Sequence, residues 1–128
     1  MSGRIRIIEQ GIVLLDFSGI KEPDKELHHS ADAKRVIGAQ PPGEALVLTD
    51  VTGSSFSQAA IESLKDLVQH NKPYVKASAL VGLSALTRVV FRALITLTRR
   101  EIRVFESRKE AVAYLLSKRV EPVVPIGD

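Results

Sequence analysis

Residues 45–68, ALVLTDVTGSSFSQAAIESLKDLV, decide the fold of this chain. They begin with a short apolar run, residues 45–48, of the kind that forms a strand buried on both faces. A polar loop follows over residues 49–57, and apolar residues then recur at helical spacing over residues 58–69. A buried strand therefore ends in a hydroxyl-rich loop that opens a helix. In α/β sheets, ligands and partners bind at such carboxyl ends of strands.

Periodicity places the other elements around this unit. Strands are predicted over residues 4–9, 12–17, 74–81 and 102–105, and helices over 24–38, 85–98 and 107–116. Gln10-Gly11 is a tight turn, so the first two strands should form an antiparallel hairpin at an edge of the sheet. Ser107 and Glu110 fit a capping box, and Ser84 fits a helix cap, as does Ser57 or alternatively Ser55.

Strands that alternate with helices predict an α/β fold. We expect a single domain with about five strands in a mostly parallel sheet, an antiparallel edge strand and four helices, joined by right-handed crossovers. The domain should span residues 1–119. Residues 120–128 should form a tail, because two prolines prevent them from being helical throughout.

Composition excludes several classes of protein. With 128 residues, 45% apolar and 26% charged, the chain is an ordinary globular domain. It has no cysteine, so it has no disulfide framework or thiolate chemistry. Few aromatic residues argue against a stacking platform for single-stranded nucleic acid. No secretory leader is evident, and Arg88 and Arg92 interrupt the longest apolar run, so we expect a cytoplasmic protein without a membrane span.

Charge is unevenly distributed along the chain. Residues 72–109 contain nine basic and two acidic side chains, a net charge of +7, whereas the whole chain carries +3. A basic segment of this kind can face nucleic acid, an acidic partner or anionic lipid. A solvated surface explains it more simply, and we expect no nucleic-acid partner.

Catalytic and metal-binding patterns are missing. The sequence has no Gly-x-Ser-x-Gly elbow, phosphate-binding loop or dinucleotide fingerprint. His28 and His29 are adjacent, so they lack the spacing of a helical metal site and should face solvent. Asp50 with Ser54 or Ser55 lacks a base. Asp16 should lie on the surface of the sheet, the alternative being a buried acid satisfied by loop amides. We expect no enzyme activity, no cofactor and no metal.

The predicted helix over residues 85–98 has two apolar sides. At about 100° per residue, one arc should face the sheet: Leu86, Val89, Val90, Ala93, Leu94 and Leu97. Phe91 and Ile95 fall outside it, in a second apolar strip bordered by Arg88, Arg92 and Arg99. Either neighbouring elements or the tail cover this strip, or it is a docking face for a second protomer, a protein partner or a lipid.

Four segments of the chain resemble one family: LLDFSGI, QPPGEALVLTDVTGSSF, PYVKASALVGLSALTRVV and RVFESRKEAVAYL. They are similar to the SpoIIAA-like branch of the STAS family (sulfate transporter and anti-sigma factor antagonist), a branch also described as related to Sec14-type lipid-binding domains. The resemblance spans about residues 12–116. It implies an α/β sheet with helices in a small cytosolic bacterial protein that has neither enzyme activity nor a cofactor.

The family's regulatory serine has no counterpart here. Anti-sigma factor antagonists carry a phosphorylatable serine at the start of the helix that follows this strand, in a context similar to Asp-Ser-Ser-Gly. The matching positions are Gln58, Ala59 and Ala60. Ser55 and Ser57 lie nearby but are not aligned with the family's serine, so the resemblance does not carry the phosphorylation switch to this chain.

The sequence thus predicts two binding surfaces. One is the loop after the central strand, with Asp50, Thr52, Ser54, Ser55 and Ser57, whose amides near the helix start would also suit an anion. The other lies on the helix over residues 85–98: Arg88, Phe91, Arg92 and Ile95. The predicted function is a regulatory interaction module that binds a protein partner or a second copy of itself. The alternative is a small carrier of a lipid or other apolar molecule with an anionic head.

Overall fold

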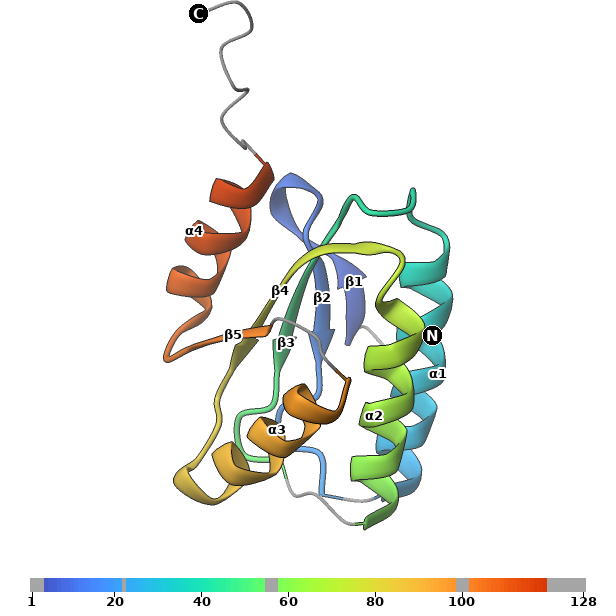
Figure 1. Ribbon diagram of the computed structural model, residues 1–128, viewed down its shortest axis with the longest axis vertical. Coiled ribbons are helices and arrows are strands. Elements are labelled where there is room, and N and C mark those ends of the chain that lie inside the picture. The colour runs from blue at the N-terminus through green and yellow to red at the C-terminus, as the bar shows by residue number, and fades with distance from the viewer. Residues whose placement is uncertain (1–3, 22, 55–57, 99–101, 120–128) are drawn as a thin grey trace, which may run out of the picture.

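A five-stranded sheet forms the centre of the protein (Figure 1). The computed structural model describes residues 4–21, 23–54, 58–98 and 102–119. Strands lie side by side in chain order: β1 (Ile5–Ile7), β2 (Val13–Asp16), β3 (Ala45–Asp50), β4 (Val75–Val81) and β5 (Ile102–Phe105). β1 pairs antiparallel with β2, and all other neighbours pair in parallel. With four helices, this confirms the predicted α/β architecture.

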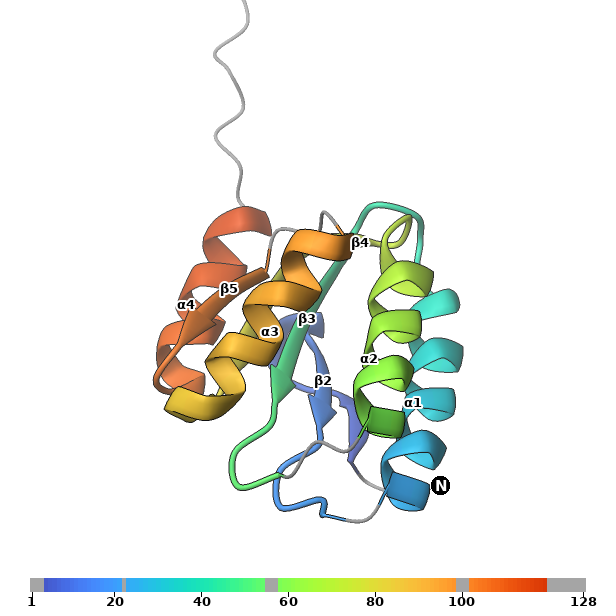
Figure 2. The ribbon, with the colours of Figure 1, turned by 60° about the horizontal axis from the view of Figure 1, so that its bottom comes forward.

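The helices form one layer on each face of the sheet. They are α1 (Pro23–Gly38), α2 (Gln58–Asn71), α3 (Ala85–Thr98) and α4 (Arg108–Arg119). Each crossover from a parallel strand advances one strand in the same direction, so with the usual right-handed connection α1, α2 and α3 fall on the same face. Figure 2 shows these three helices together, and α4 packs on β3, β4 and β5 from the other face.

Strand side chains alternate between the two layers. In β2, Val13 and Leu15 face the layer of α1–α3, whereas Leu14 faces α4. All three are buried, which explains why this strand reads as a continuous apolar run. In α4, Ala111 and Leu115 close the second core and are fully buried. The sheet therefore separates two cores, and the larger lies under three helices.

Turns and caps follow the local sequence closely. Gln10 and Gly11 have positive φ angles of 57° and 79°, and the amide of Ile8 donates to the carbonyl of Ile12 at 2.8 Å. The first strand is shorter than residues 4–9, because a 3₁₀ turn occupies Glu9–Gly11. The amide of Glu110 donates to Ser107 Oγ at 3.2 Å, which confirms the capping box. The Ser55 and Ser57 caps, Arg99 and the tail lie outside the described residues.

The predicted orientation of α3 is wrong at Val89 and Ala93, and of the two alternatives for Phe91 the structure supports the one in which neighbouring elements cover it. Phe91, assigned to an outward strip, is 4% exposed and belongs to the core, whereas Val89, assigned to the sheet side, is 70% exposed. Ala93 is also exposed. Nine of the 14 residues of α3 are apolar, so the pattern fixes the buried side only weakly. The large phenyl ring gains most from burial, and a lone valine or alanine costs little at the surface. Side chains of Leu86, Val90, Leu94 and Leu97 lie outside the description.

Two smaller differences concern α1 and membrane spans. His29 was expected to face solvent but is 8% exposed, because the buried stripe of α1 runs through Ala33 and Ile37 and continues one turn back to His29 and Ser30. No helix in the described part of the chain has both the length and the apolar character needed to cross a bilayer.

Candidate functional site

Three loops meet at the carboxyl edge of the parallel strands. The amide of Phe17 donates to the carbonyl of Asp50 at 2.8 Å, and the amide of Gly19 donates to the carbonyl of Thr52 at 2.8 Å. On the other side, the amide of Val51 donates to the carbonyl of Val81 at 2.9 Å. The loops after β2, β3 and β4 are therefore joined through their backbones, and the loop after β3 is fixed from both sides.

Two of these loops share one construction. β2 ends at Asp16, which Phe-Ser-Gly follows, and β3 ends at Asp50, which Val-Thr-Gly follows. The two aspartates are register partners. Asp16 Oδ1 accepts from the Ser18 amide at 3.0 Å and from its hydroxyl at 2.5 Å. Asp50 Oδ1 accepts from the Thr52 amide at 2.9 Å and from its hydroxyl at 2.6 Å. Each carboxylate thus shapes the turn that follows its own strand.

Arg108 connects the two carboxylates. Its Nε donates to Asp50 Oδ2 at 2.7 Å, and a terminal nitrogen lies 3.5 Å from Asp16 Oδ2. Arg4 donates to the carbonyl of Ser18 at 2.7 Å and adds a second cation. Because Arg108 is the first residue of α4, Asp16, Asp50 and Arg108, here called the carboxylate–arginine cluster, hold the start of α4 against the ends of β2 and β3.

The surroundings of Asp16 favour its charged form. Partial burial by itself raises the pKa, but the hydrogen bonds from Ser18 and the charges of Arg108 and Arg4 outweigh it, so the pKa of Asp16 lies below its ordinary value. The side chain is only 19% exposed. The expectation of a surface residue is therefore wrong, and the alternative of an acid satisfied by loop amides describes it better.

The carboxylate of Asp50 fixes the shape of the loop after β3 and is not free to bind a ligand. The side chain of Asp50 is 8% exposed, and both of its oxygens are engaged by Thr52 and Arg108. Ser54 donates its hydroxyl to the carbonyl of Val51 at 2.7 Å. Thr52 is exposed at the tip, and Ser55 and Ser57 lie outside the described residues. Asp50 and Ser54 thus fix the conformation of the loop, and Thr52 is its solvent-exposed residue.

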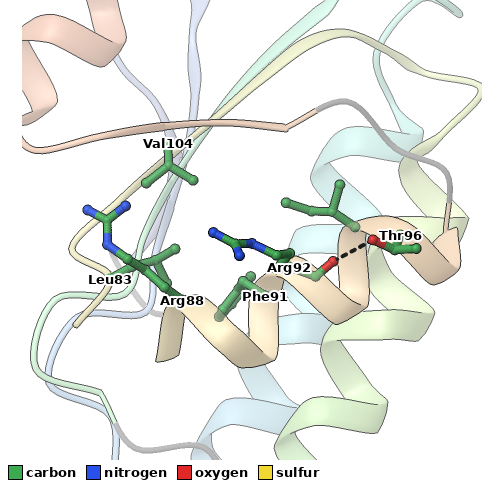
Figure 3. A pocket seen from close by; sticks show the side chains of 7 residues that line it. Leu83, Arg88, Phe91, Arg92, Thr96 and Val104 are labelled. Carbon is green, nitrogen blue, oxygen red and sulfur yellow. Dashed lines mark hydrogen bonds between the residues drawn. The ribbon is translucent and has the colours of Figure 1, made fainter. Parts of the chain in front are cut away.

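A groove lies between α3 and the edge strand β5 (Figure 3). It encloses about 180 Å³, and we call it the α3–β5 groove: Leu83, Arg88, Phe91, Arg92, Ile95, Thr96 and Val104. Phe91 and Ile95 reach it from α3 and Val104 reaches it from β5, so the floor is apolar. All four residues that the sequence singled out on this helix line the same groove.

Arginines give the groove its charge. The guanidinium group of Arg88 extends from α3 towards β5, and that of Arg92 extends along α3 towards Arg88, above Phe91 in this view (Figure 3). Both residues are exposed, and among the residues that the structure describes neither has a carboxylate partner. Thr96 Oγ1 donates to the carbonyl of Arg92 at 2.9 Å. The groove therefore combines an apolar floor with a cationic rim.

Gly82 connects the groove to the loop after β3. It has a φ of 94°, and a Cβ built on it would lie 2.5 Å from the backbone nitrogen of Thr52 and 2.6 Å from its Cα. Only glycine permits this approach. The next residue, Leu83, lines the groove. The two surfaces predicted from the sequence are therefore neighbours, joined by a close backbone contact.

Sequence reasoning missed Arg108, Leu83 and Val104. The repeated Asp-x-Ser/Thr-Gly pattern was visible and could have indicated paired turns, but the partner of the two aspartates is distant in sequence. Leu83 was interpreted only as part of a turn, and Val104 only as part of a short strand. Within the described part of the chain, no group of three or more His, Cys, Asp or Glu residues is placed to hold a metal ion.

Comparisons with protein-family models, with curated proteins and with solved structures each found no match for the chain. The likeness to the STAS family therefore stays a prediction from sequence segments. Arguments about function depend on the geometry of the site.

Proposed function

We propose that this protein is an interaction module that binds an extended, acidic segment of a partner protein in the α3–β5 groove. The observation that carries the proposal is the pair of arginines, Arg88 and Arg92, directed over an apolar floor beside an edge strand. Guanidinium groups pair well with carboxylates. An apolar side chain of the partner would enter between Leu83, Phe91 and Val104.

The edge strand supplies the second half of the argument. Within the described residues β5 pairs with β4 alone, and no described strand pairs with its other edge. Extended peptides commonly bind by adding to such an edge, with affinity from the backbone and specificity from alternate side chains. Ile102 and Val104 point to the α3 side of the sheet. An added strand would therefore direct every second side chain towards the groove, which predicts acidic and apolar residues two positions apart.

Size distinguishes this proposal from the alternative, a carrier of a lipid or other apolar molecule. Small-molecule sites usually enclose about 300–1,000 Å³, and the α3–β5 groove encloses about 180 Å³. One side chain fits this volume better than an acyl chain does. Native mass spectrometry of gently purified protein tests the alternative, which requires an added mass that is lost on replacement of Arg88 and Arg92.

Selection from a displayed library of random linear peptides tests the proposal. The intact protein should enrich sequences that carry Asp or Glu two positions from Leu, Ile, Val or Phe. Arg88→Glu/Arg92→Glu should lose this enrichment. Lys72→Glu/Lys76→Glu is the matched control, because it makes the same change of charge in the same basic segment at exposed positions outside the groove.

The proposal fails if no sequence class is enriched, or if both double variants select the same peptides as the unmodified protein. Selection of peptides with basic residues would also contradict it, because the rim would then play no part in recognition.

A further inference from the structure

A polar pocket lies at the amino ends of the parallel strands, at the opposite end of the sheet from the carboxylate–arginine cluster. It encloses about 350 Å³, and we call it the amino-edge pocket: Gly11, Gln40, Pro41, Glu44, Ala45, Leu46, Lys76 and Arg119. Ala45 and Leu46 begin β3 and are buried, so they form its floor. The volume lies within the range of about 300–1,000 Å³ that is usual for small-molecule sites. The pocket shares no residue with the α3–β5 groove, so its role is independent of the function proposed for that groove.

A β-bulge in β4 brings Lys76 to this pocket. Ala45 pairs with Val75, but the next residue of β3, Leu46, pairs with Ala77, so Lys76 is an extra residue in the ladder. In a regular strand, residues two positions apart share a face. Val75 instead packs in the core under α1–α3, whereas Ala77 packs in the core under α4. The bulge thus redirects the strand at Lys76, which lines the pocket together with Leu46, and bulges commonly redirect a side chain beside a functional site.

The turn between β1 and β2 fixes a second cation, Arg119. Arg119 donates a hydrogen bond to the carbonyl of Gln10, and the end of α4 lies beside this turn in Figure 1. Gln10 has a φ of 57°, and among the described residues it is the one residue other than glycine with a positive φ. Its neighbour Gly11 packs against the guanidinium group, since a Cβ on Gly11 would lie 3.4 Å from Nη2 of Arg119. Strained backbone of this kind is concentrated at functional sites, and here it orients the carbonyl that holds Arg119 at the pocket.

Glu44 supplies an opposite charge from the loop before β3. The backbone on both sides of Glu44 is fixed to the start of β4. The amide of Gly43 donates to the carbonyl of Pro73 at 3.0 Å, and the amide of Ala45 donates to the carbonyl of Tyr74 at 2.9 Å. The acid therefore has a defined place on the wall of the pocket.

Three charged side chains reach this pocket without neutralising one another. Glu44, Lys76 and Arg119 are exposed, and none of them forms an ion pair with any residue that the structure describes. Two cations and one carboxylate complement a molecule that has two acid groups and one amino group. We infer that the amino-edge pocket binds a free amino acid with an acidic side chain. Its two carboxylates pair with Lys76 and Arg119, and its ammonium group pairs with Glu44.

Titration of the full chain with L-glutamate, followed by NMR, tests the inference. The amide signals of Glu44, Lys76 and Arg119 should shift, whereas those of Arg88 and Ile95 on α3 should not. At equal ionic strength, L-glutamine, which has one carboxylate, and glutarate, which has no amino group, should both bind more weakly. No shift at up to about 10 mM L-glutamate, shifts confined to α3, or equal binding of the three compounds would overturn the inference.

Two variants separate the roles of the charges. Lys76→Gln should weaken the binding of L-glutamate about fivefold, as expected for the loss of one exposed ion pair. Glu44→Gln should reverse the preference, so that glutarate binds more tightly than L-glutamate, whereas a purely structural effect would weaken both ligands alike. Lys72→Gln is the matched control, because Lys72 is an exposed lysine of the same basic segment outside the pocket, and it should change neither affinity. An unaltered preference in Glu44→Gln, or equal losses in Lys76→Gln and Lys72→Gln, would contradict the assigned pairing of charges.

Discussion

At the scale of single residues, the contact between Gly82 and Thr52 holds the two halves of the candidate site together. It needs both a positive φ and the absence of a Cβ. Its position could not be predicted from the sequence, where Gly82 reads as an ordinary turn between a strand and a helix. What makes the residue indispensable is a backbone thirty positions away along the chain.

Gly82→Ala should therefore destabilise the protein by about 2–4 kcal/mol, from steric overlap together with backbone strain. Gly43→Ala separates the two effects, because Gly43 has a φ of 76° but nothing within 4 Å of an added Cβ. Strain alone should cost about 1–2 kcal/mol there. Urea denaturation measures both, and equal losses would show that the contact with Thr52 is not tight.

Asp16 makes stability depend on pH. Its folded-state pKa lies below the ordinary 3.8, so its charged form stabilises the fold above that value. This contribution is lost as the pH falls through the lowered pKa. Asp16→Asn should cost about 1 kcal/mol near neutral pH, and the difference from the unmodified protein should shrink below about pH 4.

Denaturation at a series of pH values measures this dependence. Glu62→Gln, on the exposed surface of α2, should leave the curve unchanged. A cost of Asp16→Asn that stays constant down to low pH would show that its charge is not what stabilises the turn.

At the scale of elements, the sequence pattern of α3 predicts the range of the helix but not which of its sides is buried. The range of α3 was predicted correctly, because Ser84 and the apolar run mark its bounds. Its rotation was not, because apolar residues occupy most of its circumference. The strands were predicted more accurately, since a strand has only two faces, and in β2 and β3 both faces are buried. The predicted surface residues were brought together, but through a groove whose floor is Phe91 rather than through an outward strip.

The two apolar residues of α3 should respond oppositely to truncation. Phe91→Ala should lower the free energy of unfolding by about 3–5 kcal/mol, because it empties a core position. Val89→Ala should change it by less than about 0.5 kcal/mol, because Val89 is 70% exposed. Thermal and chemical denaturation of both variants measure this. A larger loss for Val89→Ala would restore the orientation expected from the sequence.

At the scale of the whole molecule, the polar groups of the candidate site lie at one edge of the sheet, and the buried apolar residues lie at its centre. The carboxylate–arginine cluster and the loop of Thr52 lie at the carboxyl ends of β2 and β3. The alternation of strands and helices made this edge predictable from the sequence. That α4 alone covers one face of the sheet, while three helices cover the other, was not predicted, because no local sequence pattern indicates it.

Hydrogen exchange should follow this division. Amides of β3 lie between two strands and under buried side chains, so they should exchange most slowly. Amides of β5 should exchange faster, because this strand lies at an edge and its residues are half-buried or exposed. Residue-resolved exchange measured by NMR gives the order directly. Equal protection of β3 and β5 would mean that the edge of the sheet is covered in solution.

The agreement between strand order and chain order has a consequence for how the protein is made. Each new parallel strand leaving the ribosome finds its neighbour already synthesised, so the sheet can grow by addition at one end. β5 is the last of the described strands along the chain, and it therefore lies at the edge of the sheet. The surface proposed to receive a partner is thus the place where the next strand of a longer sheet would have been laid down.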